Sequence, residues 1–505
     1  MSTRPLGHIP ASRAGFLQLE QALMQLSPTR VSLLNPIKIS LVGSLLLLAA
    51  IETVGQSTEV NVSLETSAPA ALSVEIRSAA ARAWSFPNSY GNLVDLSNRI
   101  ENVRGTDSTG GTNTMVRVAP GEWRASEGVT KLNYRVRLTM PARPTDLSHV
   151  SWVTSDYGVL MLSDLLPLES RAGIDLTIKL PAGWSSASSL SPVGPSRYRI
   201  DDANRIVIAI GRALREKSAR SGSRQFKLIT TGTWAFKEGD QVKVVRQLLD
   251  AHVKTFGRAL PAEPALLLLP LPGVSSSDRW TAETRGSTVL LLMGTEAKRK
   301  QALARLRVVL AHELFHLWVP NALELQGDYD WFFEGFTIYQ ALLTGLRLHY
   351  IKFEDYLETL GRVYDSYRSS AERDKLSLLE ASERRWTSAS SLVYDKGALV
   401  AFIYDLMLRQ SSGGRVTVND IYSELQQTAS KGQANGNELL MKLLDGRRGM
   451  ERFCEDYVQS TREIDLRSVL AQFGLEVVTD GARSRIQVSN NIDGEQRQLL
   501  KSLGF

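Results

Sequence analysis

Hydrophobic and polar residues alternate at period two in several stretches between about residue 57 and residue 235. Such alternation puts one face of a β-strand on a core and the other face in water. Turn-forming segments, including Gly105–Gly111 and Pro192–Pro195, separate these runs and predict a β-sandwich-like arrangement. The alternating positions are Val60, Val62 and Leu64; Leu72, Val74 and Ile76; Leu132, Tyr134, Val136 and Leu138; and Ile174, Leu176, Ile178 and Leu180.

The pattern changes after Trp234. Gln241–Leu260 has helical periodicity, whereas Ala265–Leu269 and Ser287–Met293 are short apolar runs typical of buried strands. From there to about Leu475 the pattern is mostly helical. The chain is therefore predicted to be α+β and multidomain, with a β-rich N-terminal half and a mixed α/β, mainly helical second half.

One predicted helix extends from Glu296 to about Val319. Thr295 is a suitable residue to cap its N-terminus, and Pro320 is expected to end it. We expect this helix to lie against the core, because leucines recur at helical spacing along it. These leucines are Leu303, Leu306, Leu310, Leu314 and Leu317.

The N-terminal segment has the pattern of an export signal. Arg30 and Lys38 precede Ile39–Ile51, an apolar run of thirteen residues that is short for a membrane span. The run suits the core of a signal peptide, with cleavage near Gln56. We therefore expect export, to a periplasm or with membrane attachment through residues 39–51 and the rest of the chain outside the cytoplasm. The alternatives are a downstream start of translation and a buried hydrophobic helix.

Composition and charge narrow the classes of function. The chain has 505 residues, of which 43% are hydrophobic and 22% charged, so large cores are possible. The net charge of +6 is spread along the chain without a compact Lys/Arg block, and no nucleic-acid partner is expected. Cys454 is the single cysteine, which excludes an intramolecular disulfide and a cysteine-based metal cluster.

The predicted helix carries the motif His312-Glu313-Leu314-Phe315-His316. Residues at i and i+4 lie one turn apart on one face, so both imidazoles can reach one metal ion. Zinc suits neutral imidazole and, in catalytic sites, needs a third protein ligand and an open position. Glu313 can then act as general base toward the attacking water. The alternative is a helix with two unrelated histidines.

Glu334 is the first choice for the third metal ligand. It lies in the apolar stretch Trp331–Tyr339, where an unpaired carboxylate would be expensive to bury. A loop and a returning helix fit between the motif and this position. Glu324, Asp328 and Asp330 are nearer rivals in a polar stretch, and a buried salt bridge is the other role open to Glu334.

These motifs together resemble the gluzincin metallopeptidases, most closely the glycyl aminopeptidase family and more distantly aminopeptidase N. The resemblance extends over about residues 57–480 and implies a thermolysin-like catalytic domain. Besides the histidine motif, the segments that carry it are Trp331–Tyr339, Val393–Val400, Trp84–Gly91 and, more weakly, Trp280–Thr288.

The resemblance implies roles for two further residues. Tyr394 corresponds to the tyrosine that stabilises the oxyanion, a role that suits a phenol hydroxyl. Glu283 corresponds to the glutamate that binds the free amine of the substrate. Ala282 and Thr284 flank it where that family usually has a glycine and a histidine.

The predicted activity is zinc-dependent peptide hydrolysis with one zinc ion per chain, in the direction of an aminopeptidase. In this mechanism the Ser287–Met293 strand is expected to pair with the peptide backbone of the substrate. A zinc endopeptidase with the same site and a non-catalytic peptide-binding relative are the alternatives. The predicted units are an export segment (1–56), a β-rich domain (57–235), the peptidase domain (236–480) and a C-terminal tail (481–505).

Overall fold

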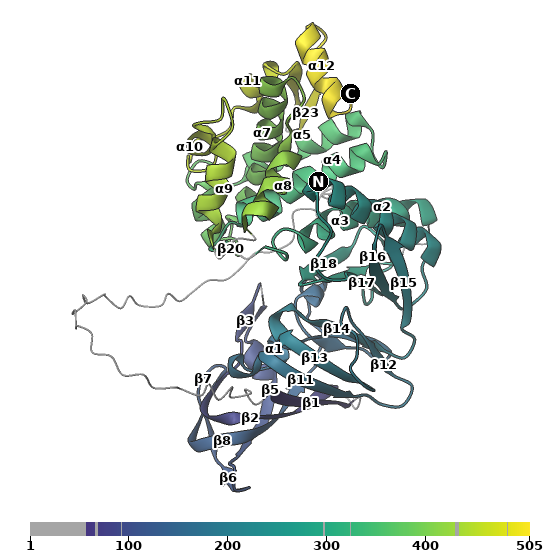
Figure 1. The fold of residues 1–505 in the computed structure, drawn as a ribbon, viewed down its shortest axis with the longest axis vertical. Helices are drawn as coiled ribbons and strands as arrows, with labels where there is room; N and C mark the ends of the chain where they lie inside the picture. The colour runs from purple at the N-terminus through teal and green to yellow at the C-terminus, as the bar shows by residue number, and fades with distance from the viewer. Residues whose placement is uncertain are drawn as a thin grey trace, which may run out of the picture.

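A computed structural model describes residues 57–65, 69–91, 93–295, 298–323, 325–429, 434–481 and 483–505. The predicted export segment and the rival ligand Glu324 lie outside these residues. The chain is α+β and multidomain, as predicted, with a β-rich part at one end and a mainly helical part at the other (Figure 1). Within the described ranges, no helix combines the length and apolar character needed to cross a membrane.

The β-rich part consists of two sheets that pack face to face. The alternating positions predicted from the sequence point into this interface, where all except the partly buried Leu180 are buried together with residues of the second sheet. The larger, eight-stranded sheet has the order β13 (Arg197–Asp202), β11 (Ala172–Lys179), β1 (Thr58–Glu65), β2 (Ala71–Ser85), β8 (Glu122–Arg137), β5 (Ile100–Thr106) and β6 (Thr112–Asn113), with β7 (Met115–Ala119) also paired to β8. The four-stranded sheet has the order β12 (Ser185–Ala187), β14 (Val207–Gly211), β10 (Tyr157–Met161) and β9 (Trp152–Val153).

A third sheet packs on the far face of the four-stranded sheet. In β14, Ile208 and Ile210 face the eight-stranded sheet, whereas Val207 and Ala209 face the third sheet, as period-two geometry requires. The third sheet has the order β15 (Arg215–Ser221), β16 (Arg224–Thr230), β17 (Ala265–Pro270), β19 (Thr288–Met293) and β18 (Trp280–Arg285).

The order of this third sheet corrects one expectation. The predicted strand Ser287–Met293 is β19, but it is paired with β17 on one side and β18 on the other. Both of its edges are therefore occupied, and it cannot pair with a substrate backbone. Among the described strands of this sheet, β18 lies at the edge, next to the site described below.

Helices cover the other face of the third sheet. Alternate residues of β17 and β19, including Leu268 and Leu291, pack against Leu248 and Leu306 of the covering helices. The helices in contact with this sheet are α2 (Glu238–Phe256) and α3 (Arg299–Glu313). The helical part continues with α4 (Thr337–Arg347), α5 (Phe353–Ser369), α6 (Leu378–Glu383), α7 (Gly397–Ser412), α8 (Val418–Ala429), α9 (Gly436–Asp445), α10 (Phe453–Tyr457), α11 (Leu466–Ala471) and α12 (Gly494–Leu503).

Short elements complete the fold. They are η2 (Leu96–Arg99), η3 (Pro144–Ser148), α1 (Leu162–Leu165), η4 (Leu168–Ser170), η5 (Ala203–Arg205), η6 (Phe315–Leu317), η7 (Trp331–Phe336) and η8 (Leu392–Lys396), and the strand pairs β3–β4 (Ser89–Tyr90, Leu93–Val94), β20–β21 (Leu325–Gln326, Ala434–Asn435) and β22–β23 (Leu475–Asp480, Arg483–Val488).

Two of the predicted domain boundaries fall inside packed structure. The third sheet already begins with β15, before the predicted boundary at residue 235. The predicted tail, 481–505, contains β23 and α12, which pack against α5 and α7. The domain boundaries themselves stay predictions.

Candidate active site

Helix α3 and the turn that follows it position the two motif histidines. The helix ends at Glu313, earlier than predicted, and a 3₁₀ turn, η6, carries His316. The N-cap residue of α3 is Lys298, so the prediction that Thr295 caps this helix is wrong. Nδ1 of His316 lies 2.9 Å from the carbonyl oxygen of Val319. A neutral imidazole that donates this bond keeps the lone pair of Nε2 for a ligand.

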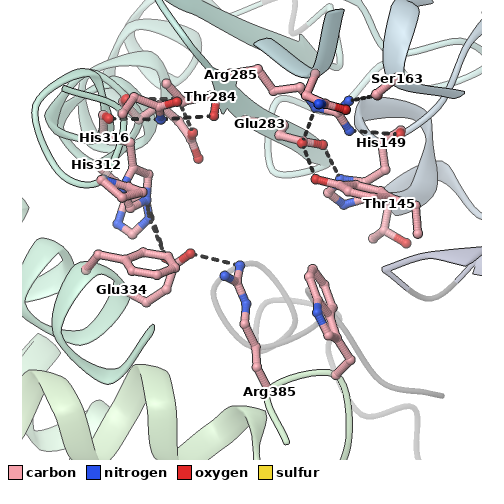
Figure 2. A pocket seen from close by; sticks show the side chains of 18 of the residues that line it. Thr145, His149, Ser163, Glu283, Thr284, Arg285, His312, His316, Glu334 and Arg385 are labelled. Carbon is pink, nitrogen blue, oxygen red and sulfur yellow. Dashed lines mark hydrogen bonds and ion pairs between the residues drawn. The ribbon is translucent and has the colours of Figure 1, made fainter. Parts of the chain in front are cut away.

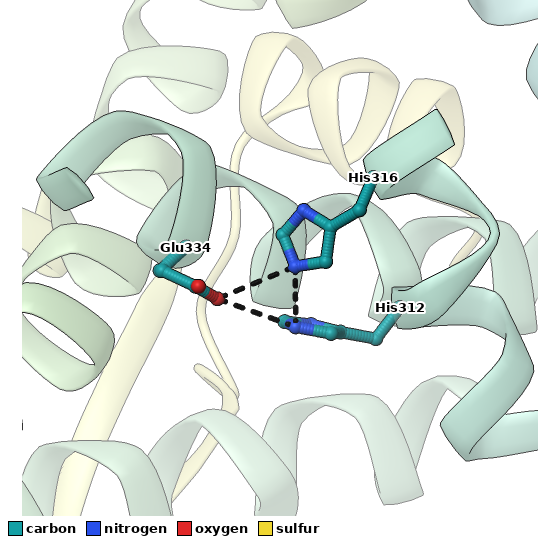
Figure 3. A group of neighbouring side chains, drawn as sticks. All are labelled: His312, His316 and Glu334. Atoms are coloured by element: carbon teal, nitrogen blue, oxygen red, sulfur yellow. Dashed lines mark hydrogen bonds and ion pairs between the residues drawn. The ribbon is translucent and has the colours of Figure 1, made fainter. Parts of the chain in front are cut away.

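Glu334 is carried by a π-helical segment, η7, that leads into α4. One extra residue per turn re-aims a side chain, and such segments are common at functional sites. The Glu334 carboxylate is almost fully buried, and one of its oxygens points at the histidines. Oε2 lies 3.4 Å from Nε2 of His312 and 3.3 Å from Nε2 of His316 (Figure 3).

The three side chains form a geometry that fits a zinc ion. The two Nε2 atoms are 3.0 Å apart, and all three ligand atoms face one another. A tetrahedral zinc ion with bonds of about 2.0–2.1 Å would space its ligand atoms about 3.3 Å apart. Two nitrogens and one carboxylate oxygen are also the donor set of many catalytic zinc sites. Of the rivals, Asp330 is paired with Arg385, and neither it nor Asp328 joins this cluster.

Arg385 holds the other oxygen of Glu334. Its Nη2 donates to Oε1 of Glu334 at 2.9 Å, and its Nη1 donates to Oδ1 of Asp330 at 2.7 Å. Burial opposes ionisation of Glu334, but the guanidinium and the adjacent His316 outweigh it and hold the pKa of the Glu334 carboxyl well below its usual range. The carboxylate is therefore ionised and oriented, as a metal ligand requires.

Glu313 lies at the end of α3, and its side chain lines the same cavity as the triad. The hydroxyl of Thr284, in β18, lies 3.0 Å from Oε2 of Glu313 and 3.0 Å from its carbonyl oxygen. Thr284, which departs from the family pattern, therefore ties the edge strand to the carboxylate next to the histidines.

Tyr394 lies on η8, a second π-helical segment, which leads into α7. Its hydroxyl accepts a hydrogen bond from Nη2 of Arg385 at 3.1 Å. The same nitrogen binds Glu334, so Arg385 links the two predicted site residues.

Glu283 lies on β18, and its carboxylate is surrounded by donors. Oε1 accepts from the hydroxyl of Tyr90 and from Nε of Arg285, each at 2.5 Å, and Oε2 lies 2.5 Å from Nδ1 of His149. Burial opposes ionisation, but Arg285 and His149 outweigh it and lower the pKa of Glu283 to about 2. Tyr90 and His149 come from the β-rich part, which therefore contributes directly to this wall.

The triad and the Glu283 cluster line one cavity of about 990 Å³. Figure 2 shows them on different walls, with Arg385 reaching toward Glu334 from a third side. Trp280, Trp386 and Arg279 also line this cavity. It is large enough for a short peptide and brings all six predicted site residues together, namely Glu283, His312, Glu313, His316, Glu334 and Tyr394.

Sequence reasoning missed four residues of this site. Tyr90 lies within the segment Trp84–Gly91, which resembles the family, but nothing in its spacing pointed to Glu283. His149 and Arg385 carried no motif signal, and Arg285 lies in the weakly resembling segment Trp280–Thr288 but had no predicted role. They come from segments far apart in the sequence, and only the packing of the sheets and helices brings them together.

Comparisons with known proteins identify a family whose model matches the segment that carries the site. Residues 305–400, which carry both histidines, Glu313, Glu334 and Tyr394, match a family model described as M61 glycyl aminopeptidase. No match was found among curated protein sequences.

Solved structures share the fold. An aminopeptidase N family protein from Idiomarina loihiensis has a TM-score of 0.71 at 18% identity, over 84% of this chain and 79% of that chain. An M1 zinc metallopeptidase mutant from Deinococcus radiodurans, bound to a Tyr-Ser-Ala substrate, has a TM-score of 0.54 at 14% identity, over 82% of this chain and 95% of that chain. The predicted resemblance is confirmed: the segment that carries the site matches the glycyl aminopeptidase family model, and the chain has the fold of aminopeptidase N family zinc peptidases, which is consistent with a distant gluzincin relationship.

Proposed function

We propose that this protein is a zinc-dependent peptidase that binds about one zinc ion per chain. The observation that carries the proposal is the convergence of the Nε2 atoms of His312 and His316 and Oε2 of Glu334 within 3.4 Å, on the wall of a large cavity. The family match over residues 305–400 supports peptide bonds as the target.

The residues around the triad suit hydrolysis of an amide. When bound, zinc supplies Lewis-acid polarisation of the scissile carbonyl and acidifies the attacking water. Glu313 accepts a proton from that water and later passes it to the leaving amine. Thr284, through its contact with Oε2 of Glu313, keeps this carboxylate at the edge of β18, where the substrate lies.

Tyr394 stabilises the negative charge that develops on the carbonyl oxygen. Its hydroxyl accepts from Arg385, and this bond does not use the phenol's own proton. A donor aimed at the developing oxyanion stabilises its charge more strongly in a site shielded from water than it would in solution.

We propose that the enzyme is an aminopeptidase, which removes residues from the free N-terminus of a peptide. Glu283 keeps its charge and lies on the edge strand β18, which an extended peptide can join. An ammonium group bound there would bring the first peptide bond to the triad. The description of the matched family supports this direction.

A zinc endopeptidase is the second candidate, and one observation favours it. The Glu283 carboxylate already has three protein donors, including the guanidinium of Arg285. These contacts offset its attraction for an amine and leave it fewer acceptor positions.

Metal analysis combined with a peptide-library digest tests the proposed function. We expect about one zinc per chain and hydrolysis that stops on chelation. Glu313→Gln should keep the metal and the fold but lose about 10²–10⁴-fold in kcat, because glutamine cannot accept the proton. A Gln variant with turnover near wild type, or a wild-type protein that holds no zinc, would refute the proposal.

A further inference from the structure

Arg385 contacts several predicted site residues at once, and none of the motifs includes it. It lies between α6 and η8, and only 15% of its side chain is exposed. One nitrogen, Nη2, donates both to Oε1 of Glu334 at 2.9 Å and to the hydroxyl of Tyr394 at 3.1 Å. A single guanidinium thus bonds the proposed third metal ligand and the proposed oxyanion donor.

The guanidinium is itself fixed from two further directions. Its Nη1 donates to Oδ1 of Asp330 at 2.7 Å, and its Cζ lies over the Trp386 ring, 4.6 Å from the centroid. The Phe333 ring is 5.4 Å away. A guanidinium held by hydrogen bonds to three groups and by a cation–π contact with a ring has little freedom to move.

We propose that Arg385 is a positioning residue that sets the geometry of Glu334 and Tyr394 together. The inference rests on the proposed peptidase function. Oε2 of Glu334 faces the histidines, so the bond from Arg385 to Oε1 fixes the rotation of the carboxylate and presents one oxygen to the metal. The bond to Tyr394 fixes the phenol relative to the same carboxylate.

A simpler role for Arg385 would be to neutralise two carboxylates, the buried Glu334 and the partly buried Asp330. That role needs a positive charge but not a planar group with several donors. The two roles therefore differ in what Arg385→Lys should do. Lysine keeps the charge as a point, but it cannot hold two carboxylates and a phenol in one fixed arrangement.

The test compares Arg385→Gln and Arg385→Lys with the control Arg384→Gln. Arg384 is the exposed residue next to Arg385 and does not line the cavity. In the full-length protein we would measure zinc affinity by chelator competition, kcat and KM on an uncharged peptide, and the melting temperature. We expect Arg385→Gln to weaken zinc binding by about 10–100-fold and to lower kcat by a similar factor with little change in KM. Arg384→Gln should change each quantity by less than about twofold.

Arg385→Lys should fold. Its zinc affinity should lie between those of Arg385→Gln and the wild type, whereas its kcat should stay close to that of Arg385→Gln. If the Gln variant does not fold, the Lys variant carries the comparison. Combining Arg385→Lys with Tyr394→Phe adds a second measurement, the effect of Arg385→Lys on kcat with and without the Tyr394 hydroxyl. Charge neutralisation alone would give the same effect in both backgrounds. If Arg385 acts through the phenol, its substitution should lower kcat clearly less in the Tyr394→Phe background than in the wild type.

Several results would overturn the inference. Wild-type zinc affinity and kcat in Arg385→Lys would mean that charge alone suffices, and fully additive effects with Tyr394→Phe would mean that the two residues act independently. A wild-type protein that binds zinc but cleaves no peptide refutes the proposed function instead, and zinc affinity in the Arg385 variants then still decides whether Arg385 positions Glu334. A wild-type protein without zinc refutes both.

Discussion

Gly335 and Gly397 bring two helical segments into backbone contact. A Cβ atom added to Gly335 would lie 2.5 Å from Cα of Gly397, and one added to Gly397 would lie 2.6 Å from the carbonyl oxygen of Trp331. Gly335 directly follows Glu334, and Gly397 lies one helical turn after Tyr394. The pair of glycines therefore allows the segments that carry these two side chains to approach closely enough to share Arg385.

Gly397→Ala should force these segments apart. We expect the free energy of unfolding to fall by about 1–3 kcal/mol, because the new methyl group meets backbone that cannot give way. A displacement of about 1 Å between Glu334 and Tyr394 should lower kcat by roughly 10²-fold. Denaturant titration and steady-state kinetics measure the two effects.

Gly345→Ala is the matched control for that substitution. Gly345 lies inside α4, where an added Cβ would meet only the Ile351 side chain at 3.6 Å, an ordinary contact. It should be neutral or stabilising by about 0.5–1 kcal/mol, because alanine favours a helix interior. If both variants are equally stable and active, close approach at Gly397 is not required.

Glu334→Ala should lose zinc. With two histidines left, the site lacks the third ligand that catalytic zinc sites use, and we expect less than about a tenth of the metal to remain after dialysis. Elemental analysis measures this directly. Asp328→Asn is the control, since Asp328 was a rival ligand from the sequence but lies outside the triad. Full zinc retention in Glu334→Ala would remove Glu334 from the ligand set.

Acetylation of a peptide substrate tests Glu283 as the amine anchor. The wild-type enzyme should cleave a free peptide with a kcat/KM on the order of 10²-fold higher than its N-acetylated form, because acetylation removes one charge-assisted hydrogen bond. The comparison needs no mutation, which matters because Glu283→Gln would leave the buried guanidinium of Arg285 without its carboxylate partner. Equal cleavage of both peptides would favour the endopeptidase.

Asp395, in η8, makes the free energy of unfolding depend on pH. Burial raises the pKa of this carboxyl from its usual value to about 7, and the hydrogen bond from Ser366, at 2.7 Å, offsets only part of the effect. The folded protein therefore binds a proton more tightly than the unfolded chain does. The contribution of Asp395 to stability is fully present below about pH 4 and is lost as the pH rises toward and through 7.

Asp395→Asn removes this titration. Relative to wild type, its melting temperature should rise between pH 5 and pH 8, corresponding to at most a few kcal/mol of unfolding free energy. The exposed Asp374 provides the control, and Asp374→Asn should give a difference from wild type that does not change over this range. A constant difference for Asp395→Asn as well would mean that the carboxyl titrates normally.

The sequence by itself predicted many of the local elements and the three side chains that converge as candidate metal ligands. Period-two alternation predicted β1, β2, β8 and β11, because a strand with one face on a core must alternate. The i, i+4 spacing of His312 and His316 and the apolar surroundings of Glu334 predicted the triad, because both follow from helix geometry and from the free energy of burying a charge.

Only the tertiary structure decided which charges surround those ligands. Arg385 meets Glu334 across 51 residues of chain, and His149 meets Glu283 across 134 residues, and local patterns carry no information about such separations. The strand order had the same origin: Ser287–Met293 was predicted as a strand, but the pairing of β17 and β18 on its two sides made β18 the edge. Long-range packing, rather than local propensity, therefore determines which strand edge lies next to the cavity.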